Sequence, residues 1–220
     1  VTVVWMAGSV LGLFVLLLWD LSGLDLAMAV TMGGSNSFPL RDHFLLQLIM
    51  HKGAKFIAWG ILFYLVLAIR WPGGFLRSVT SWDRARLPVV TLGCLLCIST
   101  LKYFSSTSCP WDLKVFGGDF PYVSHWIFRV SDGGGGHCFP AGHAATGFAF
   151  LGGYFVLARP APRAALAWAL IALSAGTLLG ISQQVRGAHF VSHTLWTAWI
   201  CWSMGGLINA ALTRIATFRS

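Results

Sequence analysis

The composition of this chain is that of a membrane protein. It has 220 residues, of which 56% are hydrophobic and 10% are charged, and its mean hydropathy is +0.72. Soluble domains carry about 25% charged residues, so an ordinary soluble protein is excluded. The formal net charge of +8 does not indicate nucleic-acid binding, because the basic residues stand at the ends of apolar runs, where membrane topology and anionic lipids explain them. No long polar linker divides the chain, so we expect a single integral-membrane domain over residues 1–220.

Apolar runs separated by polar segments predict an all-α protein with six transmembrane helices in a bundle. The expected spans are residues 3–18, 56–69, 87–101, 143–158, 164–181 and 190–212. Because a helix needs about 20 residues to cross a bilayer, the second span is expected to begin before residue 56. Residues 41–55 place apolar side chains between Arg41, His43, His51 and Lys52, which predicts an amphipathic helix lying at the membrane interface.

An even number of spans puts both ends of the chain on one side of the membrane. That side carries the following arginines in its loops and C-terminal tail: Arg70, Arg77, Arg84, Arg86, Arg159, Arg163, Arg214 and Arg219. The positive-inside rule makes it the cytoplasmic side. We therefore expect a multi-pass protein of a bacterial inner membrane, with all seven histidines toward the periplasm.

Three helix ends on the periplasmic side carry groups suited to phosphate chemistry. Hydrolysis of a phosphate ester without a metal needs cations for the non-bridging oxygens, a nucleophile, and an acid that protonates the leaving oxygen. Lys102 and Arg186 can supply the cations, and amides near Gly142, at the start of a helix, can supply aligned donors. Two histidines can divide the remaining roles. Each residue alone would be interpreted as an interfacial anchor, but the whole set on one side indicates a phosphate site.

Three short motifs follow one another along the chain. Lys102 is followed after six residues by Cys109-Pro110, residues 140–143 read Pro-Ala-Gly-His, and residues 187–193 read Gly-Ala-His-Phe-Val-Ser-His. This ordered set resembles the Lys-x6-Arg-Pro, Pro-Ser-Gly-His and Ser-Arg-x5-His-x3-Asp motifs of the type 2 phosphatidic acid phosphatase superfamily. The resemblance covers about residues 85–210, the expected catalytic core, and the six-span layout is similar to that of membrane members.

The resemblance implies a role for each motif residue. His189 would be the nucleophile that forms a phosphohistidine, and His143 would protonate the leaving group. The residues implied to bind phosphate are Lys102, Arg186, Gly142 and Ala141. Enzymes of this kind need no metal, so neither a metal nor a cofactor is expected.

Four positions depart from the family pattern. Cys109 occupies the place of the first motif's Arg, and Ala141 replaces the Ser of the second. Gln183 occupies the place of the third motif's Arg; Arg186, three residues on, lies on the same helical face and could substitute for it. His193 replaces the Asp that orients the nucleophile. Either a neutral His193 or a nearby Asp could accept that hydrogen bond, although an Asp stabilises an imidazolium better.

The five cysteines fall into two groups. Cys94, Cys97 and Cys201 lie in apolar runs and are expected to be inert core thiols. Cys109 and Cys138 lie in the long outer segment of residues 103–139. In an oxidising periplasm these two could form a disulfide that ties the segment across the site; two free thiols are the alternative.

We therefore expect a lipid phosphatase or phosphotransferase whose partners are the membrane and a lipid phosphate. Candidate substrates are undecaprenyl pyrophosphate, phosphatidylglycerol phosphate, phosphatidic acid and the lipid A phosphates, with residues 41–55 able to line the lipid entrance. Two other classes stay open. One is a membrane metal or haem protein that uses His189 and His193, spaced i, i+4, as ligands. The other is a non-catalytic relative that binds lipid phosphate, which the four departures motivate.

Overall fold

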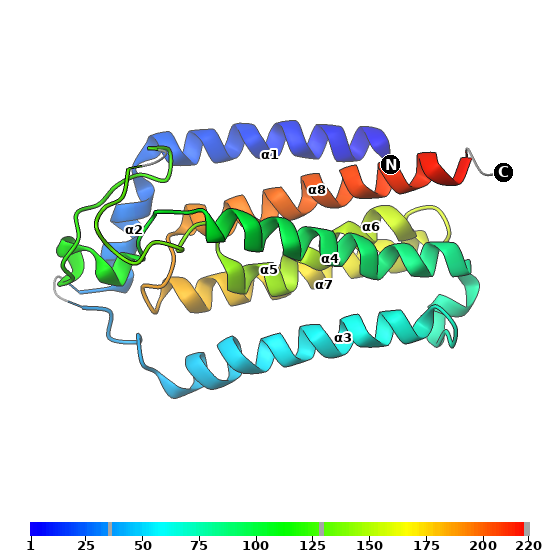
Figure 1. Cartoon of the computed structure of the whole chain (residues 1–220), viewed down its shortest axis with the longest axis horizontal. Helices are drawn as coiled ribbons and strands as arrows, with labels where there is room; N and C mark the ends of the chain where they lie inside the picture. The colour runs from blue at the N-terminus through cyan, green and yellow to red at the C-terminus, as the bar shows by residue number, and fades with distance from the viewer. Residues whose placement is uncertain (35–36, 128–129, 218–220) are drawn as a thin grey trace.

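The computed structural model describes residues 1–34, 37–127 and 130–217. In these ranges the chain is predominantly helical, with no β-strand and one isolated bridge between Leu113 and Phe120. The long helices run side by side along the longest axis, and the N- and C-terminal ends lie at the same end of the bundle (Figure 1). The predicted all-α fold is confirmed.

Four helices are long and apolar enough to cross a membrane. They are α1 (Thr2–Ser22), α4 (Ser81–Tyr103), α7 (Pro162–Gln184) and α8 (Val191–Thr217). These helices correspond to the first, third, fifth and sixth predicted spans. The protein is thus an all-helical, membrane-embedded protein with four candidate spans in the described ranges, where the sequence predicted six.

The second and fourth predicted spans are built from shorter pieces. Helix α3 (Ala54–Ala68) has 15 residues, fewer than the about 20 that cross a bilayer. The fourth predicted span consists of α5 (Gly142–Phe148), a 3-10 turn (Ala149–Leu151) and α6 (Gly152–Leu157), which follow one another directly. None of these pieces reaches the length of a span alone.

Residues 41–55 do not form the separate interfacial helix that the sequence predicted. Leu46–Gly53 is instead a π-helix that runs directly into α3 (Figure 1). Gly53 has α-helical backbone angles, so the chain does not turn between the two elements. The π-helix contacts α7, while Phe44, Leu45 and Leu48 in this segment stay exposed.

Helix α2 (Leu24–Met32) was not expected from the sequence. Gly23 separates it from α1 by adopting φ of 68°, a left-handed conformation that glycine reaches without steric cost. The turn brings α2 across the end of the bundle that lies opposite the chain termini (Figure 1). We call this end the outer end.

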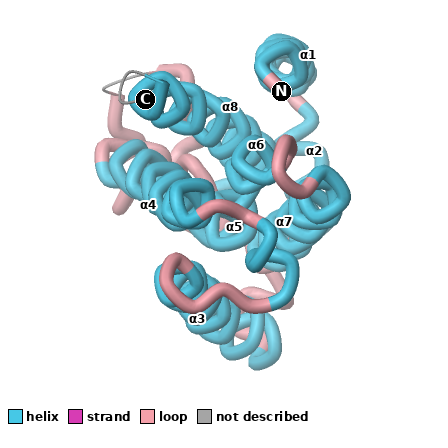
Figure 2. Tube along the Cα trace, turned by 90° about the vertical axis from the view of Figure 1, so that its right-hand side faces the viewer, coloured by secondary structure: helices cyan, strands magenta, loops and turns pink. Residues whose placement is uncertain are grey.

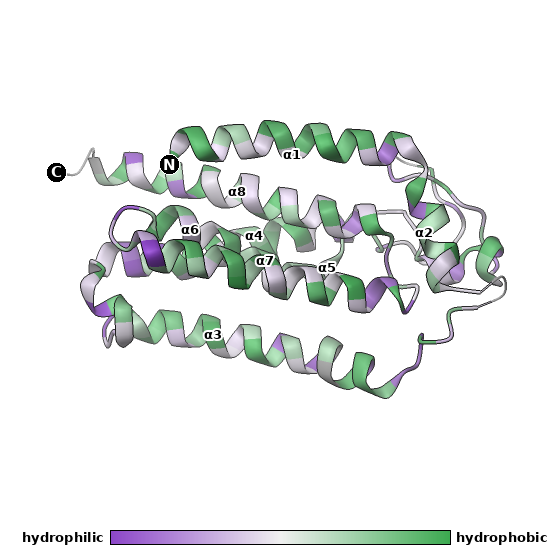
Figure 3. Cartoon of the chain, turned by 180° about the vertical axis from the view of Figure 1, so that it is seen from behind, coloured by the Kyte–Doolittle hydropathy of each residue, from purple (hydrophilic) through white to green (hydrophobic). Residues whose placement is uncertain are grey.

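Close contacts between small residues hold the bundle core together. Seen along its axis, the bundle has α1 and α3 at opposite edges of a group formed by α4 to α8 (Figure 2). A Cβ atom added to Gly205 of α8 would lie 2.7 Å from the Cα of Gly152 in α6, so only glycine permits this approach. Most residues of α1 and α3 are hydrophobic by their hydropathy (Figure 3). Phe14 of α1 and Phe56 of α3 are exposed, as lipid contact requires.

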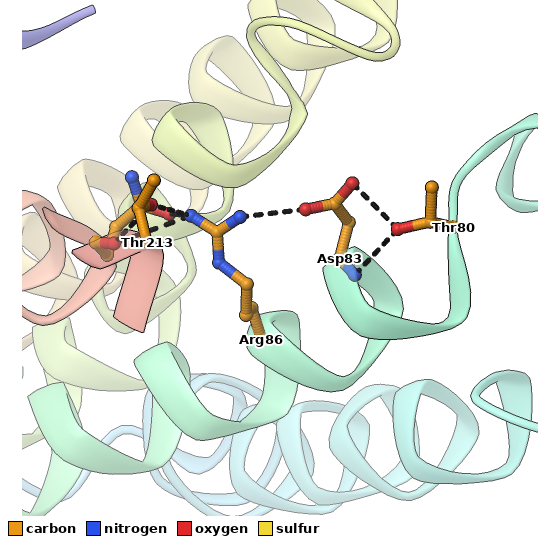
Figure 4. Close-up of polar contacts among 5 residues, drawn as sticks. Thr80, Asp83, Arg86 and Thr213 are labelled. Atoms are coloured by element: carbon orange, nitrogen blue, oxygen red, sulfur yellow. Dashed lines mark hydrogen bonds and ion pairs between the residues drawn. The ribbon is translucent and has the colours of Figure 1, made fainter. Parts of the chain in front are cut away.

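A buried arginine joins α4 to α8 near the chain termini. Arg86, 8% exposed, donates to Asp83 Oδ1 at 2.7 Å, to Thr213 Oγ1 at 2.7 Å and to the side chain of Asn209 (Figure 4). Thr80 caps the start of α4 by accepting from the Asp83 amide at 3.1 Å. These contacts fix the inner end of α4, whose other end carries Lys102.

Candidate active site

The three motif segments meet at the outer end of the bundle. Lys102 lies in the last turn of α4, His143 in the first turn of α5, and His189 between α7 and α8. These helix ends lie beside α2 and opposite the chain termini (Figure 1). The fold therefore brings together residues that are far apart in the sequence.

A backbone carbonyl orients the imidazole of His189. Its Nδ1 atom lies 2.8 Å from the carbonyl oxygen of Cys138, and the residue is 4% exposed. A carbonyl can only accept a hydrogen bond, so Nδ1 carries the proton and Nε2 keeps its lone pair. That is the tautomer a nucleophilic histidine needs.

The surroundings of His189 also favour its neutral form. Burial lowers the pKa of His189 well below its usual value, and the neighbouring His193, Lys102 and His143 lower it further. A neutral imidazole is the nucleophilic form, since protonation would occupy the Nε2 lone pair.

His143 lies near His189 at the outer end of the bundle. The two ring centroids are 6.5 Å apart, and the ring planes are inclined at 45°. In a reactive complex, a nucleophile lies about 3–3.5 Å from the atom it attacks, and a proton donor lies about 3 Å from its acceptor. The two rings therefore lie close enough together for both to act on one phosphoryl group.

Lys102 lies over the beginning of α5. A Cβ atom added to Gly142 would be 3.2 Å from the Cδ of Lys102, so the lysine side chain crosses the backbone just before His143. The ammonium group donates to the carbonyl of His137, whose Nδ1 atom is 3.1 Å from the carbonyl of Lys102. The positive charge is therefore held near the two histidines.

Ala141 joins the second motif to the third. Its amide donates to Thr197 Oγ1 at 2.9 Å and lies 3.2 Å from the carbonyl of His193. Thr197 Oγ1 in turn donates to that same carbonyl at 2.7 Å. This amide therefore anchors α5 to α8. Thr197 was not expected in the site, although its spacing of four residues from His193 puts both on one face of α8.

Arg186 reaches back along the chain to Gln183. Its Nη1 atom donates to Gln183 Oε1 at 3.0 Å, and its Nε atom donates to the carbonyl of Arg41 at 2.8 Å. Its guanidinium carbon lies 5.9 Å from the ring centre of Trp111, and that of Arg41 lies 4.7 Å from it. The arginine thus contacts the side chain that occupies the motif's Arg position. It does so from the turn after α7, which ends at Gln184, and not from the shared helical face that the sequence predicted.

The outer segment is tied together beside the site. Cys109 and Cys138 form a disulfide, with Cα atoms 5.2 Å apart. Asp132, which is buried, accepts from the amide of Ser108 at 2.9 Å, from its hydroxyl at 2.7 Å, and from the amide of Gly134 at 2.9 Å. Because Cys138 supplies the carbonyl that holds His189, the disulfide also constrains the nucleophile.

Two N-terminal carboxylates at the outer end were missed by sequence reasoning. Asp25 Oδ1 accepts from the amide of Ser192 and from Trp19 Nε1, both at 2.9 Å, and so caps the start of α8. Asp20 is buried at the end of α1 and accepts from two tryptophans. Both aspartates lie far from the motifs in the sequence, so no local pattern predicted their contacts at the outer end.

The third-motif histidines face each other. The Nδ1 atoms of His189 and His193 lie 3.4 Å apart. In the described ranges, no group of three or more His, Cys, Asp or Glu side chains has the arrangement of a metal site. The alternative of a metal or haem protein therefore gains no ligand set from this part of the chain.

Apolar helices with two histidines and a lysine gathered at their outer end define a membrane-embedded protein suited to phosphate chemistry. Residues 85–215, more than half of the chain, match the family model of the PAP2 superfamily. The chain belongs to this superfamily, whose members are generally phosphatases, and activity on phosphate esters follows from this membership. Neither the curated proteins nor the solved structures gave a match.

The disulfide should be required for full activity. Cys109→Ser, or reduction of the parent, should lower phosphate release about tenfold or more, because the carbonyl of Cys138 would no longer be fixed against His189. Cys97→Ser, which removes one of the free thiols, is the control. Five alkylatable thiols in the unreduced protein, or full activity after reduction, would contradict this expectation.

His189 should stay neutral in mildly acidic solution. Because its pKa is lowered, the Nδ1–H tautomer should persist as the pH falls through about 6.5, the usual histidine value. Nitrogen-15 NMR of histidine-labelled protein, with the resonance assigned through His189→Gln, should show a neutral ring at pH 6. Protonation of His189 at pH 6.5 or above would show that this description of its environment is wrong.

Proposed function

We propose that the protein is a metal-independent lipid phosphatase whose site faces the periplasm of a bacterial inner membrane, with six membrane-crossing segments. The observation that carries this proposal is the orientation of His189, whose Nδ1 atom is held by the Cys138 carbonyl. In the reaction, Nε2 of His189 attacks phosphorus and forms the N–P bond. The bond to the leaving oxygen breaks, and protonated His143 gives that oxygen its proton.

The second half of the reaction returns both histidines to their starting states. A water molecule attacks the phosphohistidine, and neutral His143 takes a proton from it as the N–P bond breaks. Lys102, held beside α5, stabilises the charge on the non-bridging oxygens. Inorganic phosphate leaves, His189 regains its lone pair, and His143 is again protonated.

An apolar groove next to the site supports a lipid substrate. The groove has a volume of about 360 Å³. It is lined almost wholly by apolar side chains of α3, α5 and α7 and includes Met50 of the π-helix. Thr146, which lines it, donates to the carbonyl of His143 at 2.7 Å, so the groove begins one helical turn from the proposed acid. A hydrocarbon chain in the groove would place its phosphate near the histidines.

The proposed substrates are the lipid phosphates that such a groove and site could accept. They are undecaprenyl pyrophosphate, phosphatidylglycerol phosphate, phosphatidic acid and the lipid A phosphates. Each combines long apolar chains with a phosphate group at the membrane surface. Transfer of the phosphoryl group to a lipid hydroxyl instead of water would use the same phosphohistidine.

One observation favours a non-catalytic relative as the second candidate. Cys109 stands where the first motif has its Arg, and its sulfur is engaged in the disulfide, so this position supplies no cation. Weaker phosphate binding would follow from the lost charge. A protein that binds lipid phosphate without cleaving it would show affinity for these lipids but no turnover.

The first test is phosphate release from the lipid panel in detergent with EDTA present. The parent should release phosphate from at least one lipid, and His189→Ala should lower the rate by about 10³-fold or more because the nucleophile is lost. His43→Ala changes an exposed histidine away from the motifs and is the matched control. Equal activity of the parent and His189→Ala would contradict the mechanism, and no release by the parent would favour the transferase or the non-catalytic relative.

Filling the groove should discriminate against long substrates. Ala175→Phe places a ring in the groove and should lower kcat/KM for a long-chain lipid phosphate about tenfold, the effect of losing about two buried methylenes. A short-chain soluble phosphate ester should be affected less than about twofold. Ala167→Phe, on an exposed part of the same helix, is the control. Equal losses for both substrates would mean that the groove does not hold the chain.

A further inference from the structure

The position where the third motif has its carboxylate holds His193, yet a buried carboxylate lies nearby. Asp20, from the outer end of α1, has a side chain only 6% exposed. Its Oδ2 atom accepts from Trp126 Nε1 and from Trp196 Nε1, both at 2.9 Å. Its Oδ1 atom has no hydrogen-bond partner in the part of the chain that the structure describes. Both indoles are neutral, so these two hydrogen bonds do not offset the negative charge of the aspartate.

His125 connects this carboxylate to the third motif. Its Nε2 atom lies 3.4 Å from Asp20 Oδ2, and its side chain is 8% exposed. The ring stacks on Phe139 at a centroid distance of 4.4 Å and an angle of 9°, which fixes its plane. In this position it stands edge-on to the ring of His193, with the centroids 6.0 Å apart.

The same line of side chains ends at the nucleophile. His193 Nδ1 lies 3.4 Å from His189 Nδ1, so Asp20, His125, His193 and His189 follow one another from carboxylate to reacting ring. Each of the three histidine side chains is buried or nearly so, and in such surroundings a charge acts over a longer distance than in water. The positive group that faces His189 from α4 is Lys102.

We propose that Asp20 is a positioning residue that acts through His125 and His193 to supply the negative charge absent from the third motif. This inference rests on the proposed function. Phosphorylation at Nε2 leaves His189 with a proton on Nδ1 and positive charge on its ring. The Cys138 carbonyl accepts the Nδ1 proton, and the carboxylate of Asp20 stabilises the ring charge through the two intervening imidazoles.

A purely structural role for Asp20 predicts a different outcome. The two indole hydrogen bonds tie α1 to the outer segment and to α8, and an asparagine could preserve both through its amide oxygen. Asp20→Asn therefore removes the charge while it keeps the anchor. Asp119→Asn, which neutralises an exposed aspartate in the same outer segment as His125, is the matched control.

The experiment compares the parent, Asp20→Asn, His193→Asp and the double variant, after thermal melting has shown that all four are folded. Phosphate release with EDTA present gives kcat and KM for each. Asp20→Asn should lower kcat about tenfold with little change in KM, because the charge acts on the reacting ring. In the His193→Asp background a carboxylate already stands next to His189, so Asp20→Asn should lower kcat less than about twofold.

Two results would overturn the proposal. One is unchanged kcat in Asp20→Asn, and the other is the same loss in both backgrounds, which is the mark of an anchor. If the parent releases no phosphate, the proposed function fails, and the charge coupling is then measured by nitrogen-15 NMR of His189. Asp20→Asn should lower the pH at which His189 protonates, and an unchanged titration would contradict the coupling.

Discussion

The hydrogen bond between His189 Nδ1 and the carbonyl of Cys138 is the contact on which the proposed chemistry depends. It selects the tautomer in which Nε2 can attack, and it makes a backbone atom responsible for orienting the nucleophile. The position of this carbonyl depends on how firmly the segment around Cys138 is held. The disulfide to Cys109 and the bonds around Asp132 hold this segment, so distant loop contacts become part of the site.

The bundle supports this site by fixing three helix ends. Glycine contacts bring α6 and α8 close together, and the Ala141–Thr197 bond joins the start of α5 to α8. The N-terminal helices have a second role at the outer end. Asp25 caps α8, and Asp20 gathers Trp126 and Trp196. The segment that precedes the PAP2 match, residues 1–84, therefore contributes to the placement of residues inside it.

The sequence predicted what depends on local pattern. Apolar runs predicted the all-α class and the approximate positions of α1, α4, α7 and α8. The contact between Gln183 and Arg186 spans the end of α7, where the predicted helical face does not continue. Length and composition did not show that the second predicted span combines a π-helix with α3. They also did not show that the fourth is divided between α5, a 3-10 turn and α6. The amphipathic pattern of residues 41–55 predicted a separate interfacial helix, whereas residues 46–53 form a π-helix that continues into α3.

Contacts between distant segments could not be predicted from one sequence. The pairing of Asp20 with His125 joins residues whose neighbours carry no motif, and an aspartate at a helix end usually serves as an interfacial group. Helical spacing could have indicated Thr197, because it shares a face of α8 with His193. No sequence pattern could indicate that the carbonyl of Cys138 orients His189, because every residue has a carbonyl and only the fold places this one beside the ring.

The proposed mechanism requires that His189 becomes covalently phosphorylated, so trapping the phosphorylated protein tests it. Protein mixed briefly with a phosphorus-32-labelled lipid phosphate in EDTA, then quenched in alkali, should carry label that is stable to base and lost in acid, as a phosphoramidate is. Peptide mapping should place the label on His189, and His143→Ala should slow its formation. Label on another residue, or turnover without any labelled protein under these conditions, would contradict the account.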